Sequence, residues 1–161
     1  MRVVLVDPPK PRWWLLADTV MPPVGLAYIA GFLRSKGIWV RVLDCTALRW
    51  DWRHLARALE RLKPDVVGVG GPTCYAERAL KVAKLAKELL GPDVLTVAGG
   101  PHFTILAEET LREHDYVDVV VRGEGELTAY ELARALEEGR PLRDVLGLAL
   151  RGPGDRVLFT G

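Results

Sequence analysis

Short apolar runs recur along the chain at regular intervals. Five of them are rich in β-branched residues and mostly apolar throughout: RVVLV (2–6), IWVRVL (38–43), VVGVG (66–70), VLTVA (94–98) and VDVVV (117–121). Runs without polar alternation are typical of strands buried on both faces. The pattern therefore predicts five strands that are buried on both faces of a sheet.

Between the runs, apolar residues recur three and four positions apart. These stripes predict helices around 26–33, 55–62, 79–86 and 106–111. Thr128 and Glu131 have the spacing of a capping box, which predicts that a fifth helix begins there and ends near Gly139. Alternating strands and helices indicate an α/β fold. We expect a doubly wound five-stranded parallel sheet, Rossmann-like and of flavodoxin-type order, with the first strand beside both the second and the third.

The last segment breaks this alternation. GLALRGPGDRVLF (147–159) predicts two short strands around a turn, that is, a C-terminal β-hairpin. We therefore divide the chain into a Rossmann-like domain, 1–143, and a hairpin or linker, 144–161, that leads toward a part absent from this sequence.

Composition and charge narrow the function classes. The 161 residues are 49% apolar and carry a net charge of +1, which suits one compact domain and gives no field that attracts nucleic acid. The apolar runs are too short for a membrane span, and we expect a cytoplasmic protein. Cys45 and Cys74 form neither a disulfide framework nor a metal-binding pair. The chain has no Asn or Gln, a bias typical of thermophile proteins.

In an open α/β sheet, ligands bind beyond the carboxyl ends of the strands. The loops there are DPPKPRWW, GGPTCY, GGPHFT and RGEGE. The first loop has no glycine, which excludes the nicotinamide fingerprint although Asp44 ends the second strand. Gly70 and Gly71 stand where a response regulator needs its phosphoacceptor Asp, which excludes that class too. Glycine pairs in turns are common, but several on one edge point to close approach of a ligand.

These loops resemble a known family. VDPP, PPVGLAYIAGFLRSKG, VLDC, KPDVVGVGGPT, AGGPHFT and DVVVRGEGE are similar, in order and spacing, to the N-terminal cobalamin-binding domain of cobalamin-dependent radical S-adenosylmethionine enzymes. The resemblance covers almost the whole chain. It implies that cobalamin (vitamin B12) is the cofactor, and that S-adenosylmethionine and an iron–sulfur cluster belong to a radical S-adenosylmethionine domain, in the same or a separate chain.

The resemblance also implies a set of cofactor-binding residues. Gly99 and Gly100 would let the dimethylbenzimidazole tail pass close to the backbone, so that Gly100→Leu would weaken cobalamin binding while leaving the fold nearly intact. Thr73 and His102 would bond the tail or corrin amides, and Tyr75 would cover the lower face of the corrin. The full set is Pro8, Pro9, Gly70, Gly71, Thr73, Cys74, Tyr75, Gly99, Gly100, Pro101, His102, Gly123, Glu124, Gly125 and Glu126.

Two departures from the wider cobalamin-binding pattern affect the cofactor. Many such domains have DxHxxG after the first strand, with a His that binds cobalt, whereas this loop has no His. Gly70 stands where many have a Ser that bonds the benzimidazole nitrogen. We therefore expect no protein metal ligand, and cobalamin held base-off without a His ligand.

The function that the resemblance implies is a cobalamin-binding module of a radical S-adenosylmethionine enzyme, and we expect that enzyme to be a methyltransferase. The chain lacks the three-cysteine cluster motif and is not expected to catalyse by itself, so no catalytic residue is assigned. The alternative is an α/β scaffold that has lost cobalamin and serves in protein association. Four tryptophans, Trp13, Trp14, Trp50 and Trp52, either cover the corrin edge or a docking surface, or pack in the core.

Overall fold

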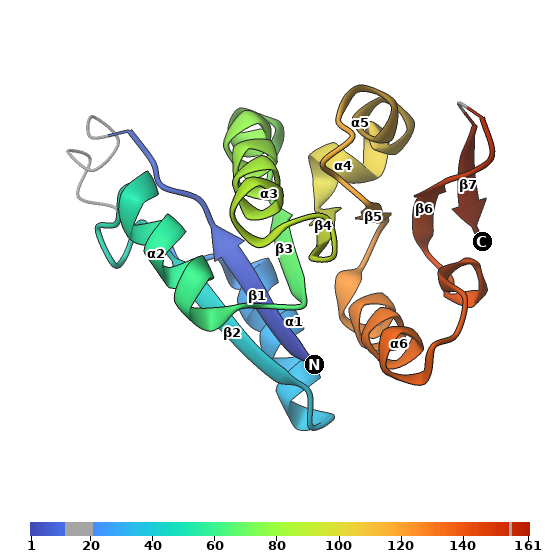
Figure 1. Ribbon diagram of the computed structural model, residues 1–161, viewed down its shortest axis with the longest axis horizontal. Helices are drawn as coiled ribbons and strands as arrows, with labels where there is room; N and C mark the ends of the chain where they lie inside the picture. Colours follow the sequence, from blue (N-terminus) through green and yellow to red (C-terminus); the bar gives the residue numbers. More distant parts are fainter. Residues whose placement is uncertain (12–20, 155) are drawn as a thin grey trace.

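The computed structural model describes residues 1–11, 21–154 and 156–161, and Figure 1 shows how its elements are arranged. The strands are β1 (Arg2–Asp7), β2 (Trp39–Asp44), β3 (Val66–Gly70), β4 (Leu95–Gly99), β5 (Val119–Val121), β6 (Leu148–Arg151) and β7 (Val157–Thr160). The α-helices are α1 (Val24–Ser35), α2 (Trp52–Leu62), α3 (Ala76–Leu90), α4 (Pro101–Ile105), α5 (Ala107–Glu113) and α6 (Gly125–Glu138), with short 3-10 turns η2 (Thr73–Tyr75) and η3 (Leu142–Asp144).

All seven strands form one sheet in the order β2-β1-β3-β4-β5-β6-β7. The first five are parallel, and β1 lies between β2 and β3, which confirms the predicted flavodoxin-type order. The predicted C-terminal hairpin is β6 and β7. It continues the same sheet, because β6 pairs antiparallel with β5. The α/β prediction is therefore confirmed, and the hairpin adds two strands to the five that were expected.

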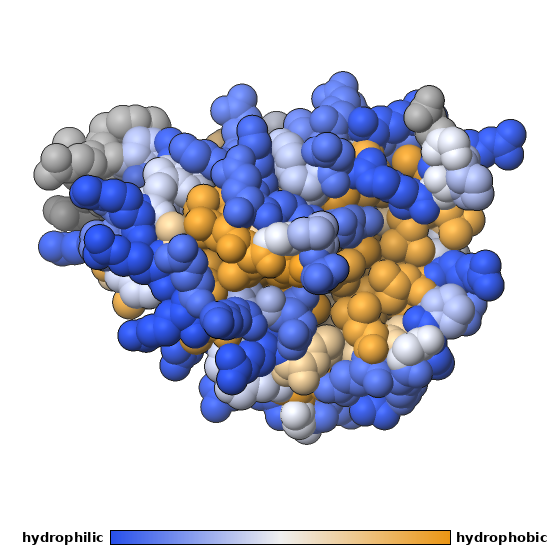
Figure 2. All heavy atoms as spheres, in the orientation of Figure 1, coloured by the Kyte–Doolittle hydropathy of each residue, from blue (hydrophilic) through white to orange (hydrophobic). Residues whose placement is uncertain are grey.

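Both faces of the sheet are buried along β1, β3, β4 and β5, as the apolar runs predicted, whereas β2 lies at the edge and is only partly buried. Val4 and Val6 point into a core shared with α2, α3 and α5. Val3 and Leu5 point into a second core, shared with α1 and α6. In Figure 2 apolar side chains are visible in the middle of the molecule, between more hydrophilic outer helices. The candidate site lies beside this second core.

One helix prediction was wrong in its starting residue. The capping box at Thr128 and Glu131 does not start a helix, because α6 already begins at Gly125, directly after the turn made by Gly123 at φ +70°. The helix predicted around 106–111 is confirmed as α5, and the structure adds the short helix α4 before it. Leu106, with φ −102° and ψ 31°, separates α4 from α5, and Pro101 begins α4.

The aromatic residues and the helices bear on two further predictions. Trp50 and Trp52 pack against the core on the α2 and α3 side, in agreement with the packing interpretation, whereas Trp13 and Trp14 lie outside the described residues. Among the helices that the structure describes, none is long and apolar enough to cross a membrane.

Candidate functional site

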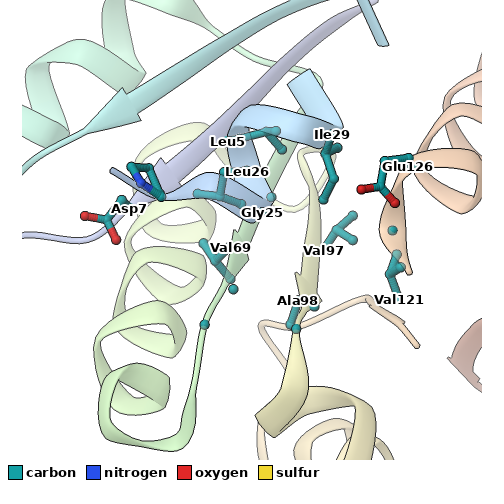
Figure 3. Close-up of a pocket in the computed structure, with 18 of the residues that line it drawn as sticks. Leu5, Asp7, Gly25, Leu26, Ile29, Val69, Val97, Ala98, Val121 and Glu126 are labelled. Atoms are coloured by element: carbon teal, nitrogen blue, oxygen red, sulfur yellow. The ribbon is translucent and has the colours of Figure 1, made fainter. Parts of the chain in front are cut away.

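A cavity of about 820 Å³ opens at the carboxyl edge of the sheet and runs down between the sheet and helices α1 and α6 (Figure 3). Its volume is in the range of small-molecule and cofactor sites. Its mouth is rimmed by the loops after β1, β3, β4 and β5, which is where the topology predicted the ligand. Most of the remaining lining is apolar and comes from the strands and the two helices.

The hollow in the sheet face has a simple origin. Leu5, Gly68 and Val97 are register partners on the neighbouring strands β1, β3 and β4. Gly68 leaves a gap in the middle of this row, and the Leu5 side chain already lies so close that a Cβ on Gly68 would be 2.6 Å from its Cδ2 atom. A glycine inside a buried strand often marks the close approach of a ligand or another backbone. Gly68 thus forms the floor of the cavity.

The two glycine pairs face each other where β3 and β4 end. A Cβ on Gly70 would lie 2.7 Å from the carbonyl oxygen of Gly99, and a Cβ on Gly100 would lie 3.0 Å from the backbone nitrogen of Gly71. Gly100 also has φ +91°, a backbone conformation that favours glycine. The expectation that Gly100→Leu leaves the fold nearly intact is therefore wrong. Gly70 and Gly100 are needed for two loops to pass each other, whatever the ligand.

Polar side chains connect the loops at the mouth. His102 Nδ1 and Thr73 Oγ1 share a hydrogen bond of 3.2 Å between α4 and the turn after β3. The hydroxyl of Thr104 accepts a hydrogen bond of 3.1 Å from the backbone N–H of Gly123. The loops that follow β3, β4 and β5 are thereby held together as one rim.

A buried ion pair lies at the end of β1. The ammonium group of Lys10 is 3.2 Å from the carboxylate of Asp7, and both side chains are almost fully covered. Thr46 donates a hydrogen bond of 3.0 Å to the same carboxylate. Burial raises the pKa of Asp7, and Lys10 and Thr46 oppose that rise. Lys10 also lies 4.8 Å from the ring centre of Tyr75, so the pair connects the first and third loops.

Neither cysteine offers a thiolate ligand inside the cavity. Burial, with the charges of Asp7 and Asp44, raises the pKa of Cys45 to about 12, so this thiol stays protonated. Cys74 is exposed and does not line the cavity. Burial also raises the pKa of Tyr75, whose ring does line the cavity as a neutral phenol.

The three histidines of the chain lie elsewhere. His54 bonds Asp51 at the start of α2, His114 bonds the Tyr116 hydroxyl, and His102 bonds Thr73. None of them lines the cavity, and the described residues contain no cluster of three or more His, Cys, Asp or Glu side chains that could hold a metal ion. The described residues of this chain therefore place no imidazole in the lining of the cavity.

Ten of the fifteen predicted site residues line the cavity: Gly70, Gly71, Tyr75, Gly99, Gly100, Pro101, Gly123, Glu124, Gly125 and Glu126. Thr73, Cys74 and His102 belong to the same loops but are outside its lining, and Pro8 and Pro9 are buried after β1. Sequence reasoning missed Gly68, the ion pair and the α1 residues Gly25, Leu26 and Ile29. Of these, only Gly68 had a usable signal, as the glycine inside the buried run VVGVG.

The decisive comparison is with protein families. The B12 binding domain family matches residues 16–133 of the chain. This chain belongs to the B12-binding domain family. The predicted family and the predicted cofactor, cobalamin, are thus confirmed.

Two relatives extend the comparison. An uncharacterized methyltransferase from Pyrococcus horikoshii is 39% identical over 155 residues, which cover 96% of this B12-binding domain and 33% of the relative. The anaerobic magnesium-protoporphyrin IX monomethyl ester cyclase of Rubrivivax gelatinosus is 35% identical over 165 residues, covering 99% of this chain and 29% of that enzyme. The match in Pyrococcus, a genus of thermophiles, agrees with the compositional prediction of a thermophilic source.

A solved structure agrees in fold. The radical S-adenosylmethionine methyltransferase TsrM from Kitasatospora setae, with cobalamin and a 4Fe–4S cluster bound, superposes with a TM-score of 0.77 at 26% identity. The match covers 94% of this chain and 27% of TsrM. The B12-binding domain described here thus spans about a third or less of the proteins that it resembles.

The cavity fits the family's cofactor. Its lower part is apolar and floored by Gly68, where a Cβ would intrude, as a flat ring system needs. Its mouth is broad and carries polar groups from Asp7, Lys10 and Thr104, as the amide-bearing edge of a corrin needs. The gap between Gly25 and Ile29 of α1 and Val97 and Val121 of the sheet is visible in Figure 3.

Proposed function

We propose that this domain holds cobalamin base-off, with the nucleotide tail in the lower cavity and the corrin at its mouth, and presents it to a radical S-adenosylmethionine domain for methyl transfer. The observation that carries the proposal is the cavity beside Gly68, which runs from the loops into the space between the sheet and two helices. When bound, cobalamin supplies cobalt-centred group-transfer chemistry. The chain supplies the shape and the polarity of its binding site.

The polarity of the lining decides which part of the cofactor we place in the lower cavity and which part at the mouth. A corrin carries many amide side chains, which would lose hydrogen bonds in an apolar space. The lower cavity is walled by side chains such as Leu5, Leu33 and Leu136, so it suits the aromatic base of the tail. The polar groups of Asp7, Lys10 and Thr104 lie at the mouth, where the amides would be.

The absence of an imidazole from the cavity lining supports the part of the proposal in which cobalt has no histidine ligand. With the tail in the lower cavity, its own base is removed from cobalt, and none of the three histidines lines the site. Tyr75 lines the cavity at the third loop and is the residue that we assign to cover the lower face. We keep the loop glycines, Thr73 and His102 as residues that shape the rim around the cofactor.

The partner domain is inferred from length and kinship. The relatives are about three times as long as the matched region, and TsrM holds a 4Fe–4S cluster as well as cobalamin. We propose that a radical S-adenosylmethionine domain, in the same or a separate chain, contributes the cluster and S-adenosylmethionine. We propose methyl transfer because the Pyrococcus relative and TsrM are both named methyltransferases, and ring formation is the alternative reaction because the Rubrivivax relative is named a cyclase. A cytoplasmic location remains a prediction from the sequence.

Cobalamin retention tests the proposal. The purified chain is mixed with hydroxocobalamin and passed through gel filtration, and the retained colour is measured. Gly25 and Gly31 provide a matched pair, because both are in α1 and a Cβ at either would meet no heavy atom within 4 Å, but only Gly25 lines the cavity. Gly25→Leu should reduce retention at least tenfold and Gly31→Leu should not. Equal retention by the two variants would contradict the proposed position of the cofactor.

The base-off state has its own measurement, electron paramagnetic resonance of the cobalt(II) form. We expect no axial nitrogen superhyperfine splitting in the parent chain or in His102→Ala. Splitting in the parent would contradict the base-off proposal. A chain that retains no cobalamin at all would favour the alternative, an α/β scaffold for protein association.

A further inference from the structure

The lower cavity differs from its mouth in hydrogen-bonding capacity. Its side chains come from β1, β3 and the middle of β4, from the last turn of α1, and from the middle and later turns of α6. They are Val3, Leu5, Leu33, Val66, Val97, Leu132, Ala133 and Leu136, together with Gly68. Each of these side chains is a hydrocarbon, apart from the glycine, so none donates or accepts a hydrogen bond.

The backbone N–H and C=O groups around the lower cavity are already hydrogen-bonded as well. Gly68 is in the ladder between β1 and β4, and Val97 pairs with both Gly68 and Val119. Their N–H and C=O groups are therefore used within the sheet. A ligand group in the lower cavity finds neither side-chain nor free strand partners among the described residues.

The polar lining residues all belong to the carboxyl edge. Asp7 ends β1, Lys10 and Thr46 follow β1 and β2, Tyr75 closes the turn after β3, Thr104 is in α4, and Glu124 and Glu126 flank the start of α6. Several of them already bond one another or the backbone: Thr46 and Lys10 with Asp7, and Thr104 with Gly123. Side chains that could hydrogen-bond a ligand are therefore confined to the rim of the cavity.

Corrinoids differ in the base at the end of their tail. The base can be a benzimidazole, a purine such as adenine, or a phenol-type ring attached through oxygen. Adenine brings an exocyclic amino group and several ring nitrogens, whereas dimethylbenzimidazole adds two methyl groups and leaves one ring nitrogen without a bond to cobalt. A polar group buried without a partner lowers affinity, whereas a methyl group against leucine and valine raises it.

We propose that the lower cavity selects corrinoids by the polarity of their tail base, accepting benzimidazole and phenol-type bases and rejecting purines. This selectivity rests on the proposed function, since it requires the tail to occupy the lower cavity. Val97, which points into the cavity in Figure 3, is the wall residue best placed to alter the selection.

The test measures binding of four corrinoids to the full chain by absorbance titration: cobalamin, a phenol-type cobamide, the adenine-base cobamide, and cobinamide, which lacks the nucleotide tail. We expect the first two to bind with similar affinity and the adenine compound roughly 10- to 100-fold more weakly, since each unpaired buried polar group costs about one or two powers of ten. Its affinity should approach that of cobinamide.

A pair of threonine substitutions locates the selecting wall. Val97→Thr places a hydroxyl in the cavity with almost no change of shape, whereas Val40→Thr places one on β2, outside the lining. Val97→Thr should reduce the ratio of the affinities for cobalamin and for the adenine compound at least threefold. Val40→Thr should leave this affinity ratio as in the parent. Circular dichroism and urea unfolding check that both variants fold.

The outcomes separate the two proposals. Equal binding of cobalamin and the adenine compound would overturn base selection and leave the proposed function standing. Binding of none of the four would overturn both. An affinity ratio that Val97→Thr leaves unchanged would overturn the assignment of selectivity to the cavity wall that contains Val97.

Discussion

Gly70 and Gly99 meet backbone to backbone at the ends of β3 and β4, where a Cβ on Gly70 would be 2.7 Å from the Gly99 carbonyl oxygen. A Cβ on Gly99 would have its nearest neighbour at 3.6 Å, the carbonyl oxygen of Val121. The two glycines lie at the same crossing of loops, but a side chain would fit at Gly99 and not at Gly70. Of Gly70 and Gly99, only Gly70 is required by the packing of the protein itself.

This asymmetry gives the first prediction. Gly70→Ala should lower the free energy of unfolding by about 2 kcal/mol, because backbone must move to admit the methyl group. Gly99→Ala should change it by no more than about 0.5 kcal/mol. Urea unfolding of the cobalamin-free variants measures both values. Equal destabilisation would mean that the crossing adapts freely to either side chain.

The second prediction concerns the buried pair of Asp7 and Lys10. Asp7→Asn leaves the lysine without its charge partner, and Lys10→Met leaves the carboxylate without its own, so each should cost about 3 kcal/mol of folding free energy. The double variant should cost at least about 1 kcal/mol less than the sum of the two, because neither charge remains buried alone. Additive losses in this double-mutant cycle would contradict a direct interaction.

The same pair has a pH signature. Burial raises the folded-state pKa of Asp7, and Lys10 opposes the rise. In Lys10→Met the folded state should therefore hold the Asp7 proton more tightly than the unfolded state. Such a variant loses stability as the pH rises from about 4, the unfolded pKa of Asp, toward the raised folded value. The parent should lose less over that interval.

The third prediction concerns Asp51, which caps α2. Hydrogen bonds from the His54 backbone N–H and the His54 ring lower the pKa of Asp51 to about 2. A depressed carboxylate pKa stabilises the fold above the unfolded value near 4, and this contribution is lost as the pH falls from about 4 to 2. Asp51→Asn keeps a good cap but does not titrate. Urea midpoints between pH 5 and 2 should therefore fall less steeply in Asp51→Asn than in the parent.

The fourth prediction concerns the hairpin. Arg151 on β6 donates hydrogen bonds to the carbonyls of Leu111, His114 and Val117, around the end of α5. Arg151→Met should therefore cost about 1–2 kcal/mol of unfolding free energy. Arg156 is an exposed arginine beyond the turn of the same hairpin, and Arg156→Met is the matched control, with almost no expected effect.

Removal of the hairpin tests whether residues 1–143 form a domain that is stable without residues 144–161. The hairpin buries Leu148 and Ala149 completely beside β5. Removing 144–161 should therefore leave a chain that unfolds at much lower urea concentration than the whole. A fragment 1–143 as stable as the full chain would show that the hairpin is only a linker.

Much of the fold was predictable because the strands are buried on both faces. After Arg2, the run RVVLV contains no polar residue, and its continuation into DPP marks the end of the strand. The start of α6 was not predictable from Thr128 and Glu131, because the turn at Gly123 starts the helix three residues before Thr128. A capping-box spacing inside an amphipathic helix is indistinguishable in sequence from one at its beginning.

The site was predictable only where glycine signalled it. The loop pairs GG and GEG stood out, and most of those residues line the cavity. Leu26 and Ile29 did not stand out, because a helix face that borders a cavity is as apolar as one that fills a core. Even the clear signal at Gly70 and Gly100 was ambiguous, since close approach of two loops demands glycine as strictly as close approach of a ligand does.

The walls of the cavity also constrain when the binding site is completed during synthesis. Val3, in the first strand, and Leu136, in the last long helix, border the same space, and α1 packs against α6 across it. A nascent chain emerges from the ribosome from its N-terminus onward. The binding site therefore lacks one wall until almost the whole domain has been translated, and cofactor capture follows synthesis of α6 rather than accompanying that of the first strands.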